Sequence, residues 1–357
     1  MMQEPSMIKI AWLSFVLFVG AVDLGAQSAM LNVPRVSQHA RITQRIGITD
    51  ITIDYSRPML RGRKIFGKVE AYGQVWRAGA NENTVIEFSD PVTIEGQPLA
   101  KGLYGLHMIP GEISWVIIVS KNHTSWGSFT YDQAEDALRA TVKPQAIQKE
   151  ETLRYDFDDA KANSAVITMR WEDVAVPFKI EVNTPEIVKQ SLERQLRGRV
   201  QFEWQPWVEA ANYLLDNKLS AEEAVKYADH AIANEDRFEC EITKAWALKT
   251  LGRKDEAQAA YGKALAMGSQ PQIHSFARGL QGQGRQDEAM ELFEDNIKKD
   301  PNSWVGHNEA ARIAVAKGDY DTAVKEMKLA LPLAPEPLKS QVSDLVERLQ
   351  RRVDINK

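Results

Sequence analysis

A change in the spacing of apolar residues near Thr184 divides this chain into two parts of different structural class. From Gln44 to Val182, apolar and polar residues alternate, which is the period of a β-strand with one buried face. Beyond Thr184, apolar residues recur every three or four positions, which is the period of an amphipathic helix. Thr184 suits a helix cap and Pro185 suits the first helical position. The sequence therefore predicts a β-domain followed by a helical domain.

The β-part is expected to be antiparallel. About eight or nine short segments alternate in polarity and are separated by Gly, Pro and Asp at turn positions. Only one helix is expected among them, capped by Asp132 and with Ala134, Ala137 and Leu138 on its apolar side. Parallel strands would need a crossover, usually a helix, between successive strands. The fold expected is therefore an antiparallel β-sandwich or a jelly roll.

Two local features of the β-part give further expectations. The alternation of Ile46 and Ile48 slips in phase at Asp50, which indicates either a bulge or two short strands. Trp115, Trp126 and Trp171 fall on strand patterns, and all three are predicted to be core residues.

The helical part contains an internal repeat. Four alanines recur at intervals of 33, 32 and 34 residues: Ala224, Ala257, Ala289 and Ala323. A Gly stands five residues before each of the last three alanines, whereas Leu219 occupies that place in the first unit. This is the pattern of a tetratricopeptide-type array, which pairs antiparallel helices around tight turns. After Pro335 the chain should add a capping helix, and the concave face should dock a protein or peptide partner.

The first 26 residues have the features of a secretory signal. Lys9 precedes an apolar run from Ile10 to Ala21, and Gly25-Ala26 suit cleavage before Gln27. The run is shorter than the roughly 20 apolar residues of a membrane span, so no stable membrane insertion is expected after cleavage. An uncleaved N-terminal anchor is the alternative. We predict a signal peptide over 1–26, a β-sandwich domain over 27–183 and a helical repeat domain over 184–357, in a periplasmic or secreted protein.

The net charge, the single cysteine and the histidine spacing argue against nucleic-acid binding, a disulfide and a metal site. The net charge is −5, which argues against broad nucleic-acid binding, although Arg41 to Arg77 holds eight cations against three acids. Cys240 is the single cysteine and cannot form an intramolecular disulfide. The histidines lack the spacing of metal ligands. No metal or other cofactor is therefore expected.

The segment from Ile51 to Thr84 combines Arg, aromatic and Gly residues more densely than any other. Its motifs are Tyr55-Ser56-Arg57-Pro58, Gly62-Arg63, Ile65-Phe66-Gly67, Tyr72-Gly73, Val75-Trp76-Arg77, Gly79-Ala80-Asn81-Glu82 and Thr84. Further motifs lie downstream: Gly102-Leu103-Tyr104, Trp115, Trp126-Gly127, Trp171, Phe202-Glu203-Trp204-Gln205-Pro206-Trp207 and Ala210-Ala211-Asn212-Tyr213. Together these motifs resemble a bacterial family catalogued as domain of unknown function 2911. The resemblance implies an exported protein with a β-domain, followed by helical repeats in some members, and it implies no established activity.

Six residues of this segment form the candidate ligand site. Arginine forks bind carboxylate or phosphate, Asn and Glu suit hydroxyl groups, and a Trp can stack on a ring. The expected ligand is small and anionic or sugar-like, or is a component of the cell envelope. The alternative is that Arg77 and Glu82 pair with each other and that the loop has no ligand. The six candidates are Arg57, Arg63, Trp76, Arg77, Asn81 and Glu82.

Two functional classes follow from these observations. The first is a non-enzymatic exported protein whose β-domain binds a ligand and whose repeats dock a protein. The alternative is a hydrolase of envelope or polysaccharide substrates that uses Glu82 as its acid or base. Glycoside hydrolysis usually needs two carboxylates, and the sequence shows no evident second one. No residue is therefore predicted to be catalytic, and binding is the favoured function.

Overall fold

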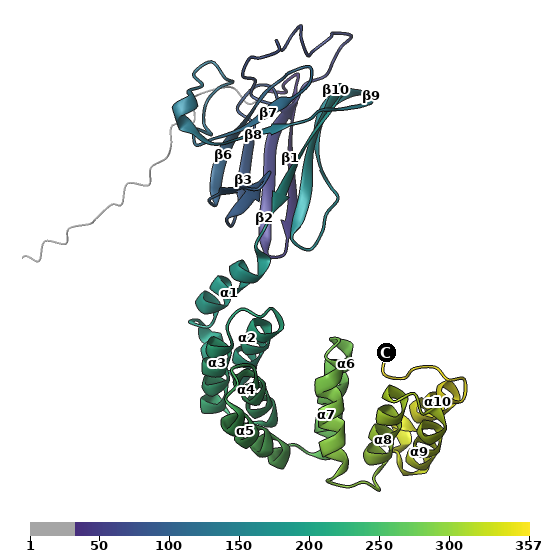
Figure 1. The fold of residues 1–357 in the computed structure, drawn as a ribbon. Coiled ribbons are helices and arrows are strands. Elements are labelled where there is room, and N and C mark those ends of the chain that lie inside the picture. Colours follow the sequence, from purple (N-terminus) through teal and green to yellow (C-terminus); the bar gives the residue numbers. More distant parts are fainter. Residues whose placement is uncertain (1–32) are drawn as a thin grey trace, which may run out of the picture.

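The computed structural model describes residues 33–357, so the expected signal peptide and its cleavage site before Gln27 lie outside the described residues. Figure 1 shows a β-domain that continues through helix α1 into a curved array of helices. The predicted fold class, an antiparallel β-domain followed by a helical repeat array, is confirmed.

Within the described residues, ten strands form two antiparallel sheets. The larger sheet has six strands in the order β1-β2-β3-β6-β7-β8, and the smaller has four in the order β5-β4-β10-β9. The strands are β1 (Gln38–Ile46), β2 (Thr49–Arg57), β3 (Val85–Phe88), β4 (Val92–Ile94), β5 (Gln97–Leu99), β6 (Gly102–Ile109), β7 (Trp115–Ser120), β8 (Asp136–Val142), β9 (Gln145–Asp158) and β10 (Ser164–Glu181).

Aromatic side chains from both sheets meet in one core. Trp115 of β7 is 1% exposed and Trp171 of β10 is 2% exposed, as predicted for these two residues. Phe66, from the loop after β2, lies between them with ring centroids 4.7 Å from Trp115 and 5.9 Å from Trp171. The core prediction for Trp126 is wrong, since it is 47% exposed in the loop after β7. The polar residues around it offer no alternating apolar face to pair with a sheet.

The phase slip near Asp50 marks a hairpin. β1 and β2 pair from Gln38 opposite Arg57 to Ile46 opposite Thr49, which leaves Gly47 and Ile48 as the turn. Gly47 has a φ of +60°, a conformation that glycine adopts without steric cost. Two-residue turns of this kind match the twist of the strands they connect.

The helix predicted near Asp132 is wrong. Asp132 does accept a hydrogen bond from the backbone N–H of Ala134 at 2.9 Å, but the cap serves a single 3-10 turn, Gln133–Glu135. The chain then enters β8, where Leu138 pairs with Val119 of β7. Pairing with β7 along β8 outweighs a local capping signal, because sheet formation depends on neighbours distant in sequence.

The two parts of the chain meet at α1 (Thr184–Gln195). Asn183 rather than Thr184 occupies the cap position, and Pro185 lies in the first turn. Ile187 is 6% exposed and belongs to the core of the β-domain. A Cβ added to Gly47 would lie 2.4 Å from the Cγ2 of Thr184. The side chain of Thr184, at the start of α1, therefore lies directly against the backbone of Gly47 in the β1–β2 turn.

The array consists of four helix pairs followed by a last helix, within the part of the chain that the structure describes. No helix in that part is long and apolar enough to cross a membrane. The pairs are α2 (Trp204–Asp216) with α3 (Ala221–Asn234), α4 (Phe238–Thr250) with α5 (Lys254–Met267), α6 (Gln270–Gly282) with α7 (Gln286–Ile297) and α8 (Trp304–Ala316) with α9 (Tyr320–Leu333), and the last helix is α10 (Lys339–Gln350).

Glycines make the turns inside the last three pairs, as the repeat pattern predicts. Gly252, Gly284 and Gly318 have φ values of +73°, +79° and +78°. In the first pair, Lys218 takes a φ of +53° instead, one residue before the Leu219 that aligns with these glycines. The turn between α2 and α3 is one residue longer than the others, which accounts for the weaker repeat signal there.

Candidate functional site

Two of the six predicted ligand residues hold loop backbone in place. The Nε of Arg57 donates to the carbonyl oxygen of Leu153 at 3.0 Å. Arg63 donates from Nε to the carbonyl of Leu60 at 3.0 Å and from Nη2 to that of Met59 at 2.9 Å. These contacts tie the loop after β2 to itself and to β9, so part of the donor capacity of both arginines is already used.

Trp76 lies in the core rather than on an exposed face. Its side chain is 3% exposed and stacks on Trp171, with ring centroids 5.9 Å apart and an interplanar angle of 21°. Its Nε1 donates to the carbonyl of Gly79 at 3.1 Å. The ring of Trp76 is therefore not accessible for the expected stacking on a ligand. Packing against a residue 95 positions later, which the local sequence does not reveal, buries this ring.

The structure does not pair Arg77 with Glu82. Glu82 forms an ion pair with Arg35 at 3.3 Å. Arg77 is half-buried near Glu70, where burial raises the pKa of the Glu70 carboxyl and the charge of Arg77 lowers it. The Nε of Arg77 is buried and has no hydrogen-bond partner among the described residues.

Asn81 and Glu82 are brought together at the edge of a hollow of about 590 Å³ beside the β1–β2 hairpin. Asn81 also donates from Nδ2 to the carbonyl of Ser37 at 3.1 Å. Sequence reasoning missed His39 and Asp54, which line the same hollow and lie 2.5 Å apart. The hairpin register pairs His39 with Ser56 and Arg41 with Asp54, so His39 and Asp54 are diagonal neighbours on paired strands.

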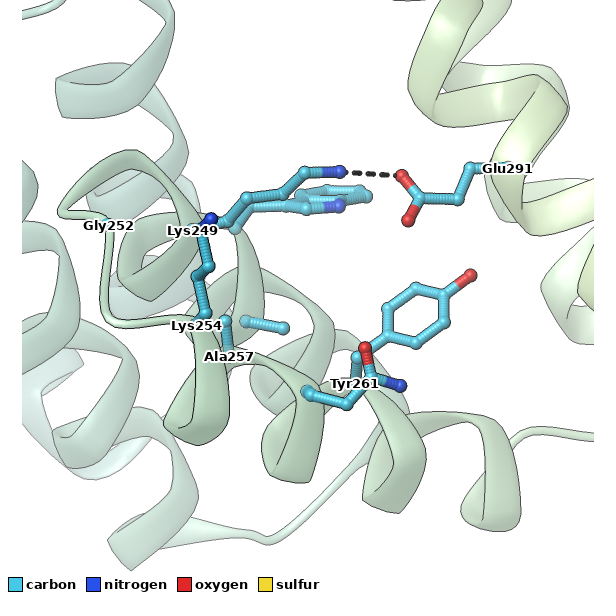
Figure 2. Close-up of a pocket in the computed structure, with 9 residues that line it drawn as sticks. Lys249, Gly252, Lys254, Ala257, Tyr261 and Glu291 are labelled. Atoms are coloured by element: carbon cyan, nitrogen blue, oxygen red, sulfur yellow. Dashed lines mark hydrogen bonds and ion pairs between the residues drawn. The ribbon is translucent and has the colours of Figure 1, made fainter.

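Two hollows of the helical array adjoin Trp246 of α4. The first, of about 340 Å³, is bounded by α4, α5 and α7, and Figure 2 shows Lys249 and Glu291 joined across it, with Tyr261 nearby. Lys249 Nζ donates to Glu291 Oε2 at 2.8 Å. In the second, of about 500 Å³, the Arg285 guanidinium lies 4.4 Å from the centroid of the Trp246 ring and 3.3 Å from a carboxylate oxygen of Asp216. Lys249 and Arg285 are thus each paired with an acid.

A third hollow, of about 430 Å³, lies on the first helices of successive pairs, α6 and α8, and on α10. It is lined by Arg278, Arg312 and Arg348, one from each helix. These arginines are spaced 34 and 36 residues apart, close to the repeat interval, so they occupy comparable places on successive helices. Sequence reasoning missed them, although a comparison of equivalent repeat positions would have aligned all three.

A buried polar network lies beside the third hollow. Glu309 of α8 is fully buried, and its Oε1 accepts from Asn296 Nδ2 at 2.7 Å and lies 3.1 Å from Nδ1 of His274. Burial raises the pKa of Glu309 to about 8 and lowers that of His274 to about 3. Both groups are therefore mainly neutral at pH 7, and they interact through a hydrogen bond rather than as an ion pair. In the described part of the chain, no group of three His, Cys, Asp or Glu could hold a metal ion.

Comparison with protein families gives a match for each part of the chain. Residues 37–180 match the family described as protein of unknown function (DUF2911). The β-domain resembles this family. Residues 242–267 match a tetratricopeptide repeat, so the resemblance predicted from the sequence is confirmed in both parts. A search of curated proteins found no match.

Solved structures similar to this chain include one that is described as a TPR protein. The crystal structure of MamA shares 18% identity over 44% of this chain and 92% of its own, with a TM-score of 0.26. YrrB, described as a TPR protein with an unusual peptide-binding site, shares 16% sequence identity over 46% of this chain and 84% of its own, with a TM-score of 0.23. A chain of the APC/C hetero-tetramer Cut9-Hcn1 shares 18% sequence identity over 48% of this chain and 33% of its own, with a TM-score of 0.26. With TM-scores below 0.5, these similarities carry no argument about this chain.

Proposed function

We propose that this protein is an exported, non-enzymatic binding protein whose helical array docks a protein partner. The observation that carries the proposal is the open hollow on α6, α8 and α10, because it lies on one continuous face of the repeat array. Stacked helix pairs create extended surfaces of this kind, which repeat proteins use for binding. The tetratricopeptide match supports the same protein-interaction role.

Export is supported by the signal features of the first 26 residues and by what the family resemblance implies. Cleavage before Gln27 would give a periplasmic or secreted protein. The partner would then be another exported or envelope protein.

Site-specific photo-crosslinking in the native host tests the docking function. Ser275 of α6 is exposed and lines the hollow, so benzoylphenylalanine in its place should yield an adduct with a protein of defined mass. The same label in place of Lys328, an exposed residue of α9, is the matched control and should yield no such adduct. Equal crosslinking from both positions, or from neither, would contradict docking at this face.

A small ligand on the β-domain is proposed at the hollow beside Asn81 and Glu82. Arg35, Ser56 and His39 bring donors and acceptors to the same hollow, which suits an anionic or sugar-like ligand. An NMR titration with N-acetylglucosamine should shift resonances of these residues, and Glu82→Gln should weaken the effect. Glu87→Gln on β3 is the control, and shifts that are unchanged by Glu82→Gln would contradict this site.

The hydrolase alternative has less support than binding. It requires a second carboxylate directed at the same substrate as Glu82. Asp54 lines the same hollow, but its carboxylate is contacted by His39 at 2.5 Å and Arg41 at 3.9 Å. Measurement of hydrolysis of envelope polysaccharide by the intact chain and by Glu82→Gln distinguishes the two functions, and we expect no activity that depends on Glu82.

A further inference from the structure

We propose that the hollow between α6, α8 and α10 binds an acidic internal segment of the partner protein, with Arg278, Arg312 and Arg348 as the residues that recognise its carboxylates. The proposal rests on the docking function and specifies the chemistry of the partner. We call this hollow with its three arginines the arginine pocket.

The three guanidinium groups converge on one place. Arg312 is 4% exposed, while Arg278 and Arg348 are half-buried on either side of it. Burial, together with the charges of Arg278 and Arg348, lowers the pKa of Arg312 to about 9. Burial and the charge of Arg348 also lower the pKa of Arg278. Like charges are therefore held near one another, an arrangement that an incoming anion would stabilise.

No carboxylate forms an ion pair with these arginines, as far as the described residues show. Arg278 donates to the amide oxygen of Gln281, and Arg312 donates to Asn308 Oδ1 at 2.9 Å. The other acceptors are backbone carbonyls, that of Ile355 at 2.6 Å from Arg312 Nη1 and that of Asp354 at 3.3 Å from Arg348 Nη2. Every hydrogen-bond acceptor of the three guanidinium groups is thus a neutral group.

The two nearest acids, Glu309 and Asp354, raise the pKa of Arg312 through their charge, but neither forms an ion pair with the three arginines in the described residues. Glu309 lies one turn before Arg312, but its carboxyl group faces His274 and Asn296 and is mainly protonated at pH 7. Asp354 contacts Arg348 through its backbone, while its side chain accepts from the backbone N–H of Asn356 at 2.8 Å. In the two hollows beside Trp246, in contrast, Lys249 and Arg285 form ion pairs with Glu291 and Asp216.

The end of this chain shows that the face can hold a peptide backbone. Ile355 is 1% exposed and lines the arginine pocket, and its carbonyl accepts from Arg312. Asn356 donates from Nδ2 to the carbonyl of Arg312 at 2.9 Å and accepts from Gln281 at 3.1 Å. The remaining space of about 430 Å³ falls within the roughly 300–1,000 Å³ usual for ligand pockets.

Apolar side chains complete the pocket and refine the expected ligand. Trp304 of α8 and Val342 and Leu345 of α10 form its apolar lining. A peptide that suits both surfaces carries Asp or Glu next to an aliphatic or aromatic residue. Arginine forks bind carboxylates with two parallel hydrogen bonds, which gives direction to the contact.

Selection from a random dodecapeptide display library on the immobilised full chain tests the inference. Enriched peptides are then synthesised with amidated C-termini and titrated by fluorescence anisotropy. We expect enrichment of acidic residues beside apolar ones, and a loss of at least about tenfold in affinity for Arg278→Gln and for Arg348→Gln, since bonds between two charged groups are the strong ones. Arg351→Gln, an exposed arginine after α10, is the matched control and should change affinity less than about twofold.

The possible outcomes separate this inference from the docking function. Enriched peptides without acids, bound equally by all variants, would overturn the acidic ligand while leaving docking intact. Binding that requires a free C-terminal carboxylate would overturn an internal segment as the occupant. Absence of any enriched peptide would also overturn the inference, and the Ser275 crosslink would then decide the docking function by itself. Thermal melts show whether each Gln variant is folded, and Arg348→Lys, which keeps the charge but loses the fork, should bind with intermediate affinity.

Discussion

Replacing Glu309 with Gln should remove a specific pH dependence from the stability of the helical array. Glu309 is fully buried on α8, and burial raises its pKa in the folded protein to about 8, against an ordinary value of 4.5. The folded state therefore holds a proton that the unfolded state releases at a lower pH. This contribution to stability is fully present below pH 4.5 and is lost as the pH rises through 8.

The size of the effect follows from the same pKa. A pH of 7 lies one unit below the folded-state pKa of Glu309, which is about 8, and each such unit corresponds to about 1.36 kcal/mol of free energy. The free energy of unfolding should thus fall by about 1.4 kcal/mol between pH 7 and pH 9 through this group alone. Gln preserves the oxygen that accepts from Asn296 and cannot ionise, so the variant should lack this decrease.

Urea titrations of the full chain at pH 7 and pH 9, followed by circular dichroism of the helices, measure the difference. His274 interferes little, since its pKa of about 3 in the folded state and ordinary value of 6.5 both lie below this range. Glu294→Gln, at an exposed position of α7, is the control and should behave like the unaltered protein. An equal decrease in the unaltered protein and in Glu309→Gln would refute the assignment of a buried, protonated Glu309.

Three further predictions test other parts of the account. Intact-mass measurement of the protein exported by a bacterial host should give a chain that begins at Gln27, and retention of the predicted signal peptide would count against cleavage at that site. Trp76→Ala should lower the free energy of unfolding by roughly 3–5 kcal/mol, because the ring is 3% exposed, and a change below about 0.5 kcal/mol would show that the ring is not in the core. Gly47→Ala should lower the free energy of unfolding by more than the roughly 1–2 kcal/mol expected for a left-handed backbone, because the added Cβ would also meet Thr184. Gly96→Ala should cost only the backbone contribution, since nothing lies within 4 Å of its Cβ position. Equal losses of stability in the two variants would contradict the close approach of α1.

The features that the sequence predicted well are those fixed by local chemistry. Gly252, Gly284 and Gly318 adopt the left-handed conformation that a short turn between helices requires, and they stand at a constant distance from buried alanines. The alternation of apolar and polar residues from Gln44 to Val182 likewise predicted the antiparallel strands of the β-domain. Periodicity and turn residues carry this information within a few positions of chain.

The features that could not be predicted from the sequence depend on contacts between residues that are distant in the chain. Trp76 looked like a recognition surface because arginines and glycines surround it, yet packing against Trp171 places it in the core. Leu138 was expected on a helix because Asp132 offered a cap, but pairing with Val119 makes it part of a strand. The arginine pocket combines side chains from α6, α8 and α10, which only the stacking of the repeats brings together.

Hydrogen exchange measured on the full chain, alone and bound to the protein captured through Ser275, tests the central claim most directly. Docking on the face formed by α6, α8 and α10 predicts slower exchange in those helices on binding, with β2 and β7 unchanged. Slower exchange confined to the β-domain, or to the second helices α7 and α9, would contradict the proposed role of this face.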